Sequence, residues 1–581
     1  MVLEKINSPS DIKYLDDATL NILAEDIRKG IINRVNTVGG HLGPDLGFVE
    51  PTIALHYVFN SPKDKFVFDV SHQIYPHKML TGRKEGFLNP KENYHISGYS
   101  NPAESEHDTF VIGHTSTSVS LATGIAKARN VRGEKYNVIA IIGDGSLSGG
   151  EAFEGLDNGA LLNSNFIVIV NDNEMSIAEN VGGLYKNLKD LRDSNGNCEN
   201  NYFKALGYDY YYLDEGNDIR KLIDLFSKVK DTNKPTVVHL HTLKGKGYKP
   251  AEEDKESFHW ALPGFLDNKS QSFISGEDNY YAVTNKYLLE KVKSDNSVIV
   301  INPATPGAVG FSKDFRKALG NNYTDTGIAE EHAVAYSSAL AKYGAKPVLA
   351  ILSSFVQRTY DQLSQDLALN SSPATILVYW GGITSADMTH LCCFDIPLIS
   401  NIPNIVHLNP TTKEEYLNML NWSTEQTQYP VVIRVPNIFK TTGTPDNTDY
   451  SQLNKYKVKE IGSQVALIGL GDFYWLADEV KEELRKHNIN PTMINPIFAS
   501  GLDEETLSSL TNSHKIVVTL ENGVLDGGFG EKISRYFGDK NIKVLNYGQK
   551  KEFTDRTPEG KLYTKYRLTK EQITEDILRN I

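Results

Sequence analysis

Two polar residues stand at the ends of two apolar runs and could together bind a metal ion. Asp144 follows the run Val138 to Gly143, and Asn173 closes the run that begins at Phe166. Each run is rich in β-branched residues and stops abruptly at small or polar ones, which is typical of a buried strand. A carboxylate and an amide oxygen suit Mg²⁺, which completes its coordination with water and phosphate oxygens. The pattern predicts a site for a magnesium-bound phosphate.

A βαβ unit is expected to position these two residues. In a parallel sheet, ligands bind beyond the carboxyl ends of the strands, so Asp144 and Asn173 should lie at one rim. Glycines 143 and 145 would let backbone N–H groups approach a phosphate. Gly-Asp-Gly alone is more often a simple turn, so the prediction depends on the second strand end. The residues between the runs, 148–163, have apolar side chains at helical spacing: Ala152, Phe153, Leu156 and Ala160.

Further motifs stand in order along residues 1–435. They are Gly40-His41-Leu42, Asp69-Val-Ser-His-Gln-Ile-Tyr-Pro-His-Lys78, Glu104-Ser-Glu106, Gly113-His-Thr-Ser-Thr-Ser118, Asn171-Asp-Asn-Glu-Met-Ser-Ile177, Gly327-Ile-Ala-Glu-Glu-His332 and Ser353-Ser-Phe-Val-Gln-Arg-Thr-Tyr-Asp-Gln362. In composition and order they resemble the 1-deoxy-D-xylulose-5-phosphate synthase family, which consists of transketolase-like enzymes that use thiamin diphosphate (ThDP). The resemblance continues more loosely to the end of the chain.

The resemblance implies an α/β fold of three domains with mostly parallel sheets, usually in a homodimer, with ThDP bound between the first two domains. The expected boundaries are 1–279, 280–445 and 446–581. Strand-like and helical segments alternate throughout, as mostly parallel sheets covered on both faces require. Polar stretches at 249–279 and 446–457 read as linkers, and the first is expected also to cross the active site.

The resemblance also implies a cofactor site and its residues. The expected Mg²⁺ ligands are Asp144, Asn173 and the carbonyl of Met175. The expected ThDP contacts are His72, Gly113, His114, Thr115, Gly145, Ser146, Asn173, Tyr248, Glu330 and Phe355.

Glu330 is expected to be the carboxyl group that exchanges a proton with the cofactor's aminopyrimidine ring. A buried Glu retains its proton readily, which suits this role. Taken alone, Glu330 would be only an acidic residue favoured by a helix dipole. Its neighbour Glu331 would point about 100° away. The resemblance adds three catalytic histidines and two substrate contacts: His41, His259, His390, Arg358 and Asp387.

The implied reaction decarboxylates pyruvate and joins the two-carbon unit to an aldehyde, in a family linked to isoprenoid and thiamin biosynthesis. At two positions where the family has phosphate-binding arginines, this chain has Trp380 and Asn437, and Leu352 replaces a Tyr. Arginine grips phosphate bidentately and neither residue replaces it. We therefore expect a weak preference, or none, for glyceraldehyde 3-phosphate over unphosphorylated aldehydes, unless Arg358, Arg434 or Lys440 binds the phosphate instead. A transketolase-type enzyme with a ketose donor and a non-catalytic paralogue remain as alternatives.

Composition excludes several other classes of protein. The net charge of −13 argues against general nucleic-acid binding, which needs a basic surface. No apolar stretch is long enough to span a membrane, and the first residues lack a signal-peptide pattern. The three cysteines, Cys198, Cys392 and Cys393, cannot form a disulfide framework. A cytoplasmic enzyme is expected.

Overall fold

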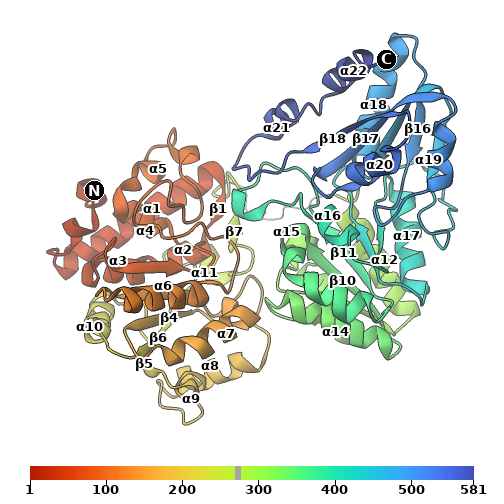
Figure 1. Ribbon diagram of the computed structural model, residues 1–581. Helices are drawn as coiled ribbons and strands as arrows, with labels where there is room; N and C mark the ends of the chain where they lie inside the picture. The colour runs from red at the N-terminus through yellow and green to blue at the C-terminus, as the bar shows by residue number, and fades with distance from the viewer. Residues whose placement is uncertain (268–275) are drawn as a thin grey trace. The chain divides into compact units, whose positions relative to one another are not determined.

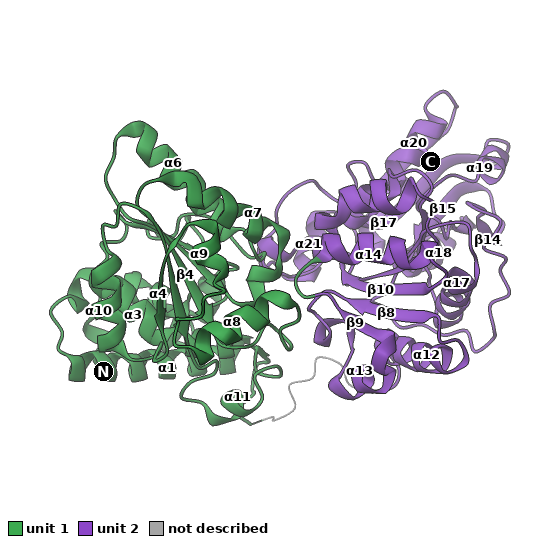
Figure 2. Cartoon of the chain, turned by 90° about the horizontal axis from the view of Figure 1, so that it is seen from below, with its two compact units in different colours: residues 1–273, 327–329 green, residues 274–326, 330–581 purple. Residues whose placement is uncertain are grey.

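The computed structural model describes residues 1–267 and 276–581. The chain divides into two compact units, coloured separately in Figure 2. Unit 1 contains residues 1–273 with 327–329, and unit 2 contains residues 274–326 with 330–581. Within the described residues, no helix has the length and apolar character needed to cross a membrane.

Unit 1 is built on a five-stranded sheet whose strands all run parallel, in the order β2-β3-β4-β6-β5. The sheet is buried on both faces, which explains why its central strands are almost wholly apolar. The strands are β2 (Lys65–Phe68), β3 (Val138–Gly143), β4 (Phe166–Asp172), β5 (Asp209–Leu213) and β6 (Pro235–His241).

Alternate residues of each central strand enter two different cores, as the two-residue period of a strand requires. Ile139 and Ile141 pack on one side with helices α1 (Asp17–Val38), α3 (Val49–Val58) and α10 (Ile219–Val229). Ala140 and Ile142 pack on the other side with α6 (Ser118–Arg132) and α7 (Gly150–Gly159). Figure 1 shows these helices covering the sheet. The helix predicted over 148–163 thus begins at Gly150 and is followed by a 3₁₀ turn, Ala160–Leu162.

A two-stranded antiparallel ribbon joins distant parts of unit 1. Strand β1 (Gly40–His41) pairs with β7 (Trp260–Ala261), and His41 lies opposite Trp260. Gly40 has a φ of 141°, and a β-carbon there would lie 2.6 Å from the Tyr75 hydroxyl. Only glycine fits this position, which brings His41 next to the polar segment that follows α11 (Lys249–Glu253).

Unit 2 contains two sheets. The first has six parallel strands in the order β12-β13-β11-β10-β8-β9. Helices α12 (Tyr280–Ser294), α13 (Lys313–Leu319) and α17 (Lys413–Glu425) pack on one face, with α14 (Glu330–Lys342) and α16 (Asp395–Ser400) on the other. The strands are β8 (Val298–Asn302), β9 (Tyr323–Asp325), β10 (Lys346–Leu352), β11 (Thr375–Tyr379), β12 (Val406–Leu408) and β13 (Val431–Arg434).

The second sheet of unit 2 has the order β14-β16-β15-β17-β18, with β14 as an antiparallel edge strand. Helices α18 (Phe473–Lys486) and α22 (Lys570–Leu578) pack on one face, and α19 (Glu504–Leu510) and α20 (Phe529–Phe537) on the other. The strands are β14 (Lys457–Glu460), β15 (Gln464–Leu470), β16 (Thr492–Asn495), β17 (His514–Val524) and β18 (Lys543–Gln549).

The predicted α/β class with mostly parallel sheets is confirmed. The three domain boundaries stay a prediction. The remaining α-helices of the described residues are α2 (Gly43–Gly47), α4 (Tyr75–Lys78), α5 (Glu85–Leu88), α8 (Gly183–Asp193), α9 (Tyr202–Leu206), α15 (Ser353–Val356) and α21 (Glu559–Lys565).

Candidate active site

The ends of β3 and β4 bring Asp144 and Asn173 to the same corner of unit 1. The backbone N–H of Asp144 donates to the carbonyl of Asn171 at 3.0 Å, and the Asn180 amide donates to the Asp144 carboxylate at 2.7 Å. The Oδ1 atoms of Asn173 and Asn180 are buried without a hydrogen-bond partner. Burial, reinforced by the negative charge of Asp172, raises the pKa of Asp144 to about 8. Among the described residues, no hydrogen-bond donor reaches either amide oxygen.

Those groups fit a hard divalent cation. Mg²⁺ would satisfy the carboxyl group of Asp144, which resists ionisation, and the two buried amide oxygens, which lack hydrogen-bond donors. In the described part of the chain, no three His, Cys, Asp or Glu side chains gather in a cluster able to hold a metal. A metal here must therefore take amide and backbone oxygens besides Asp144, which is the kind of ligand set expected from Asn173 and Met175.

Lys244 is a polar residue of this corner that the sequence analysis missed. Its buried Nζ donates to the carbonyl of Ser176 at 2.6 Å and lies 3.1 Å from His259 Nδ1. Burial lowers the pKa of Lys244 to about 7, and the charge of Asp144 opposes that shift. No ion pair to Lys244 occurs among the described residues, so a bound anion would stabilise its charge. Its only sequence signal is a place beside the glycines of the turn after β6.

A second lysine contacts the segment that carries Asn173. Lys255 Nζ donates to the backbone carbonyl of Asn173 at 3.1 Å. It belongs to the polar stretch that the sequence analysis expected to cross the active site. This contact links that stretch to a predicted metal ligand.

Three histidines from distant parts of the sequence form a cluster beside Lys244. The ring centroids of His41, His72 and His259 lie 5.3 to 5.5 Å from one another. Burial lowers the pKa of His72 to about 3 and that of His259 well below its usual range, and Lys244 adds to both shifts. The imidazoles of His72 and His259 are therefore neutral near pH 7, so they can accept a proton or a hydrogen bond. The structure thus brings three of the predicted residues together.

The loop that carries Gly113, His114 and Thr115 is held against the same rim. The Asp69 carboxylate accepts the backbone N–H groups of Ser116 and Ser118 at 2.8 and 2.9 Å. The Ser116 hydroxyl then donates to the carbonyl of Ser146 at 2.8 Å. Asp69 therefore fixes one predicted phosphate-contacting loop beside another.

Two other predicted cofactor residues differ in their surroundings. A β-carbon at Gly145 would lie 2.8 Å from the Ser176 hydroxyl, so glycine is needed for the close approach of the two loops. Tyr248 packs edge-to-face against Phe258 and Phe265. Its ring is part of an aromatic group next to His259.

In unit 2, Glu330 is the first residue of α14 and is buried. Burial raises its pKa, while the guanidinium of Arg358, 3.5 Å from its carboxylate, acts in the opposite direction. His390 lies near Phe355, with ring centroids 5.9 Å apart. Burial lowers the pKa of His390 to about 4. The structure groups these residues in pairs, Glu330 with Arg358 and His390 with Phe355.

Trp380 and Asn437, at the two positions where the resemblance predicts arginines, both lie in neutral or acidic surroundings. Trp380 is 38% exposed, and its indole N–H donates to the Tyr281 hydroxyl at 2.8 Å. The Asn437 side chain donates to the carbonyl of Gly381 at 2.7 Å. The backbone N–H of Asn437 donates to the Asp472 carboxylate at 3.0 Å. Asp472, whose pKa is raised by burial, is thus an acidic group in direct contact with Asn437.

Nearby cations are also committed elsewhere. Arg434 is buried and forms a bidentate pair with Asp395, at 2.7 and 3.0 Å. Lys440 lies over the ring of Trp475, 5.2 Å from its centroid. Neither contact favours a role in phosphate binding.

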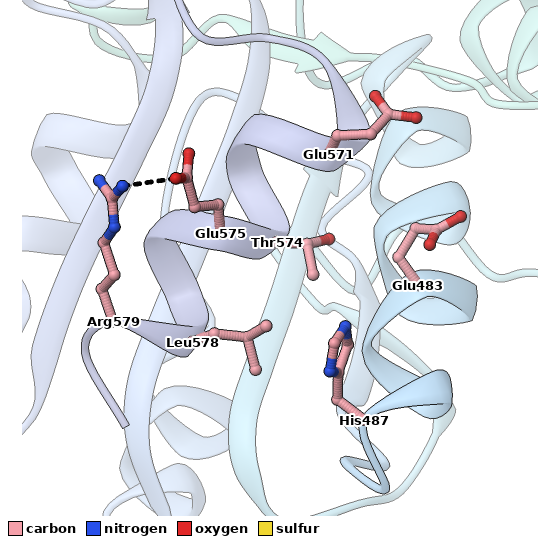
Figure 3. Close-up of a pocket in the computed structure, with 7 residues that line it drawn as sticks. All are labelled: Glu483, His487, Glu571, Thr574, Glu575, Leu578 and Arg579. Carbon is pink, nitrogen blue, oxygen red and sulfur yellow. Dashed lines mark hydrogen bonds and ion pairs between the residues drawn. The ribbon is translucent and has the colours of Figure 1, made fainter.

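A pocket of about 450 Å³ lies in unit 2 (Figure 3). It is formed between α18 and α22, and an ion pair joins Arg579 to Glu575 on α22. None of the predicted site residues contributes to it. Its lining residues are Glu483, His487, Glu571, Thr574, Glu575, Leu578 and Arg579.

Three family models match the chain in succession. Residues 3–199 match the model described as 1-deoxy-D-xylulose-5-phosphate synthase. Residues 279–438 match the transketolase pyrimidine binding domain, and 454–573 the transketolase C-terminal domain. The 1-deoxy-D-xylulose-5-phosphate synthase of Caldanaerobacter subterraneus is 37% identical over 100% of this chain and 99% of that relative. The chain belongs to the 1-deoxy-D-xylulose-5-phosphate synthase family.

Other members are similar at comparable levels. The 1-deoxy-D-xylulose-5-phosphate synthase of Lachnoclostridium phytofermentans is 35% identical, over 100% of this chain and 99% of its own length. Among solved structures, transketolase from Campylobacter jejuni is 16% identical with a TM-score of 0.44, covering 97% of this chain and 100% of that one. As a member of the 1-deoxy-D-xylulose-5-phosphate synthase family, the chain is a ThDP-dependent transferase with a transketolase-like fold and a requirement for a divalent metal.

Proposed function

We propose that this chain decarboxylates pyruvate and joins the remaining two-carbon unit to an aldehyde, working as a cytoplasmic homodimer. The observation that best supports this is the corner of unit 1 where Asp144, Lys244 and neutral histidines meet. The family model over residues 3–199 favours this reaction over a transketolase-type reaction with a ketose donor. Retention of Asp144, Asn173 and Glu330 argues against a non-catalytic paralogue.

The proposed anchor for the cofactor is the rim of the unit 1 sheet. Asp144, the Oδ1 of Asn173 and the carbonyl of Met175 would hold Mg²⁺. The Lys244 ammonium and the N–H groups of the Gly113–Thr115 loop would stabilise the negative diphosphate. When bound, ThDP supplies the carbon nucleophile and the electron sink.

Glu330 is proposed to hold and exchange the proton at the aminopyrimidine nitrogen N1′. Its burial keeps the carboxyl group protonated to a higher pH than an exposed Glu. Arg358 limits that effect, so the carboxyl group can still release its proton. A group whose two protonation states are both accessible is what repeated proton exchange requires.

The histidines are proposed to handle protons around the substrates. His41, His72 and His259 can accept hydrogen bonds from hydroxyl groups because burial keeps the rings of His72 and His259 neutral. His390 and Asp387, in unit 2, are proposed to contact the acceptor. Phe355 offers an apolar face beside His390.

The acceptor is proposed to be an aldehyde for which a phosphate group adds little affinity. Trp380 and Asn437 carry no charge, and Asp472 lies next to Asn437. A phosphate placed near these residues would gain no charge-assisted pair from them. Glyceraldehyde 3-phosphate and its unphosphorylated analogues are therefore both candidates.

Purified protein with ThDP and Mg²⁺ provides the test. Pyruvate should release CO₂ and, with an aldehyde present, yield a 1-deoxyketose identified by mass spectrometry. Ketose phosphates offered as donors in place of pyruvate should give no transfer product. Transfer from a ketose without pyruvate turnover would contradict the proposal and favour a transketolase activity.

A further inference from the structure

The segment between β11 and α16, residues 380–394, carries the proposed acceptor residues Asp387 and His390. The contacts that hold this segment in place come from four residues near the end of the chain: Asn522, Val524, Asp555 and Arg556. We propose that Arg556 is a positioning residue that fixes the 386–390 segment and so gives the C-terminal region a part in substrate handling. This inference rests on the proposed function in assigning Asp387 and His390 to the acceptor.

Both ends of the segment are fixed by the carboxyl end of β17. The Asn522 side-chain oxygen accepts the backbone N–H of Ile383 at 2.8 Å. The backbone N–H of Val524 donates to the carbonyl of Cys393 at 3.0 Å. A β-carbon at Gly382 would lie 2.5 Å from the Asn522 amide nitrogen, so the approach is close. The segment is therefore an extension of two sheets rather than an independent loop.

Two consecutive residues after β18 fix the tip of the segment. The backbone N–H of Arg556 donates to the carbonyl of Ala386 at 2.9 Å. The backbone N–H of Met388 donates to the Asp555 carboxylate at 3.3 Å. The Nε of Arg556 lies 3.9 Å from the Asp387 carboxylate. The residues on both sides of Asp387, and Asp387 itself, thus contact the same short stretch.

The Arg556 guanidinium also contacts Asp555, with Nη2 to Oδ2 at 2.8 Å. It therefore stabilises two carboxylates, that of Asp387 in the 380–394 segment and that of Asp555 after β18. Arg556 has a φ of 42°, in the left-handed region that non-glycine residues seldom adopt. Such a backbone persists where several contacts hold it, as the three described here do.

A chain of contacts leads from Arg556 to the imidazole. The Asp387 carboxylate accepts the backbone N–H and the hydroxyl of Thr389 at 3.1 and 2.9 Å. The Thr389 hydroxyl lies 2.9 Å from His390 Nδ1. A change in the direction of the Asp387 carboxylate would move the Thr389 hydroxyl and with it the ring of His390. Arg556 acts on the acceptor through these residues and does not touch it.

Arg556→Gly removes the guanidinium but retains the backbone N–H and favours the positive φ. We expect the KM for the acceptor aldehyde to rise on the order of 5-fold, as loss of a partly exposed ion pair allows, with ThDP affinity and pyruvate decarboxylation unchanged. Amide hydrogen exchange over residues 386–390 should accelerate. Arg556→Lys should change the acceptor KM and the exchange rate over 386–390 less than Arg556→Gly does. Arg579→Ala, at the residue that follows helix α22, is the matched control and should behave as the native chain does.

An Arg556→Gly protein with native acceptor KM and native exchange over 386–390 would overturn the proposal. Should this variant fail to fold, Arg556→Gln preserves the length of the side chain without its charge and is subject to the same criteria. If the native chain shows no pyruvate turnover, the proposed function fails. The exchange rates then still decide whether Arg556 orders the segment.

Discussion

The guanidinium of Arg358 lies 3.5 Å from the Glu330 carboxylate, at the start of α14. Burial raises the pKa of Glu330 and Arg358 acts against it, with burial the stronger influence. The sequence assigned Arg358 only to the substrate. Its position gives it a second effect, because it sets how readily Glu330 releases its proton.

Replacing Glu330 by Gln should separate cofactor binding from chemistry. An amide can still meet the pyrimidine nitrogen, so ThDP affinity should remain within a few-fold of the native value. Turnover should fall by about 10²-fold or more because the amide cannot exchange a proton. CO₂ release from pyruvate, measured beside a ThDP titration, tests both parts. Near-native turnover would assign the proton exchange to another carboxyl group, with Glu331 the first candidate.

Mg²⁺ binding should depend on pH through Asp144. The pKa of its carboxyl group is raised to about 8 in the metal-free protein. Below that pH the group binds a proton that the metal must displace, so Mg²⁺-dependent ThDP affinity should weaken as the pH falls from 8 to 6. Calorimetric titrations at several pH values measure this slope.

Asp144→Ala should abolish Mg²⁺-dependent ThDP binding. Unchanged ThDP affinity in this variant would exclude Asp144 from the cofactor anchor.

Lys244→Met should reduce ThDP affinity by about 10- to 100-fold, the value of one charge-assisted contact. The methionine retains most of the apolar stem, so the fold should persist. Lys246→Met, two residues on, changes a lysine paired with Glu50 and serves as the control. Fluorescence or calorimetric titration with ThDP separates the two variants. Equal affinities in both would show that Lys244 does not contact the diphosphate.

The acceptor preference follows from Trp380 and Asn437. Loss of two phosphate contacts, each worth about 1.5–3 kcal/mol, should leave little discrimination between glyceraldehyde 3-phosphate and D-glyceraldehyde. The ratio of their kcat/KM values, with pyruvate as donor, measures it. A ratio above about 10³ requires at least ~4 kcal/mol of phosphate recognition and would refute the prediction. Asn437→Arg should raise this kcat/KM ratio, provided that the new guanidinium does not form an ion pair with Asp472.

The sequence was most informative where the determining pattern is local. The apolar runs before Asp144 and Asn173 predicted two adjacent buried strands, and β3 and β4 are those strands. The edge strand β5, Asp-Tyr-Tyr-Tyr-Leu, was missed because its residues are polar or half-exposed. The grouping of His41 with His259 came from family resemblance, since no local pattern links positions so far apart.

Some parts of the site could not be predicted because they depend on burial. Nothing in the neighbours of Lys244 indicates that its amine is enclosed next to Asp144. The contact of Asp472 with Asn437 likewise joins segments on two different sheets. Such contacts follow from tertiary packing, which residue types at fixed spacing do not specify.

The β1–β7 ribbon affects the order in which the chain can mature on the ribosome. All five strands of the unit 1 sheet have been synthesised once residue 241 has emerged. The strand that pairs with His41, however, is synthesised later, at Trp260–Ala261. Because domains generally fold as units, the ribbon of unit 1 can form only after residue 260 has also been synthesised. A ribosome stalled between these two points would carry a chain that contains all five sheet strands but lacks both His259 and the partner strand of His41.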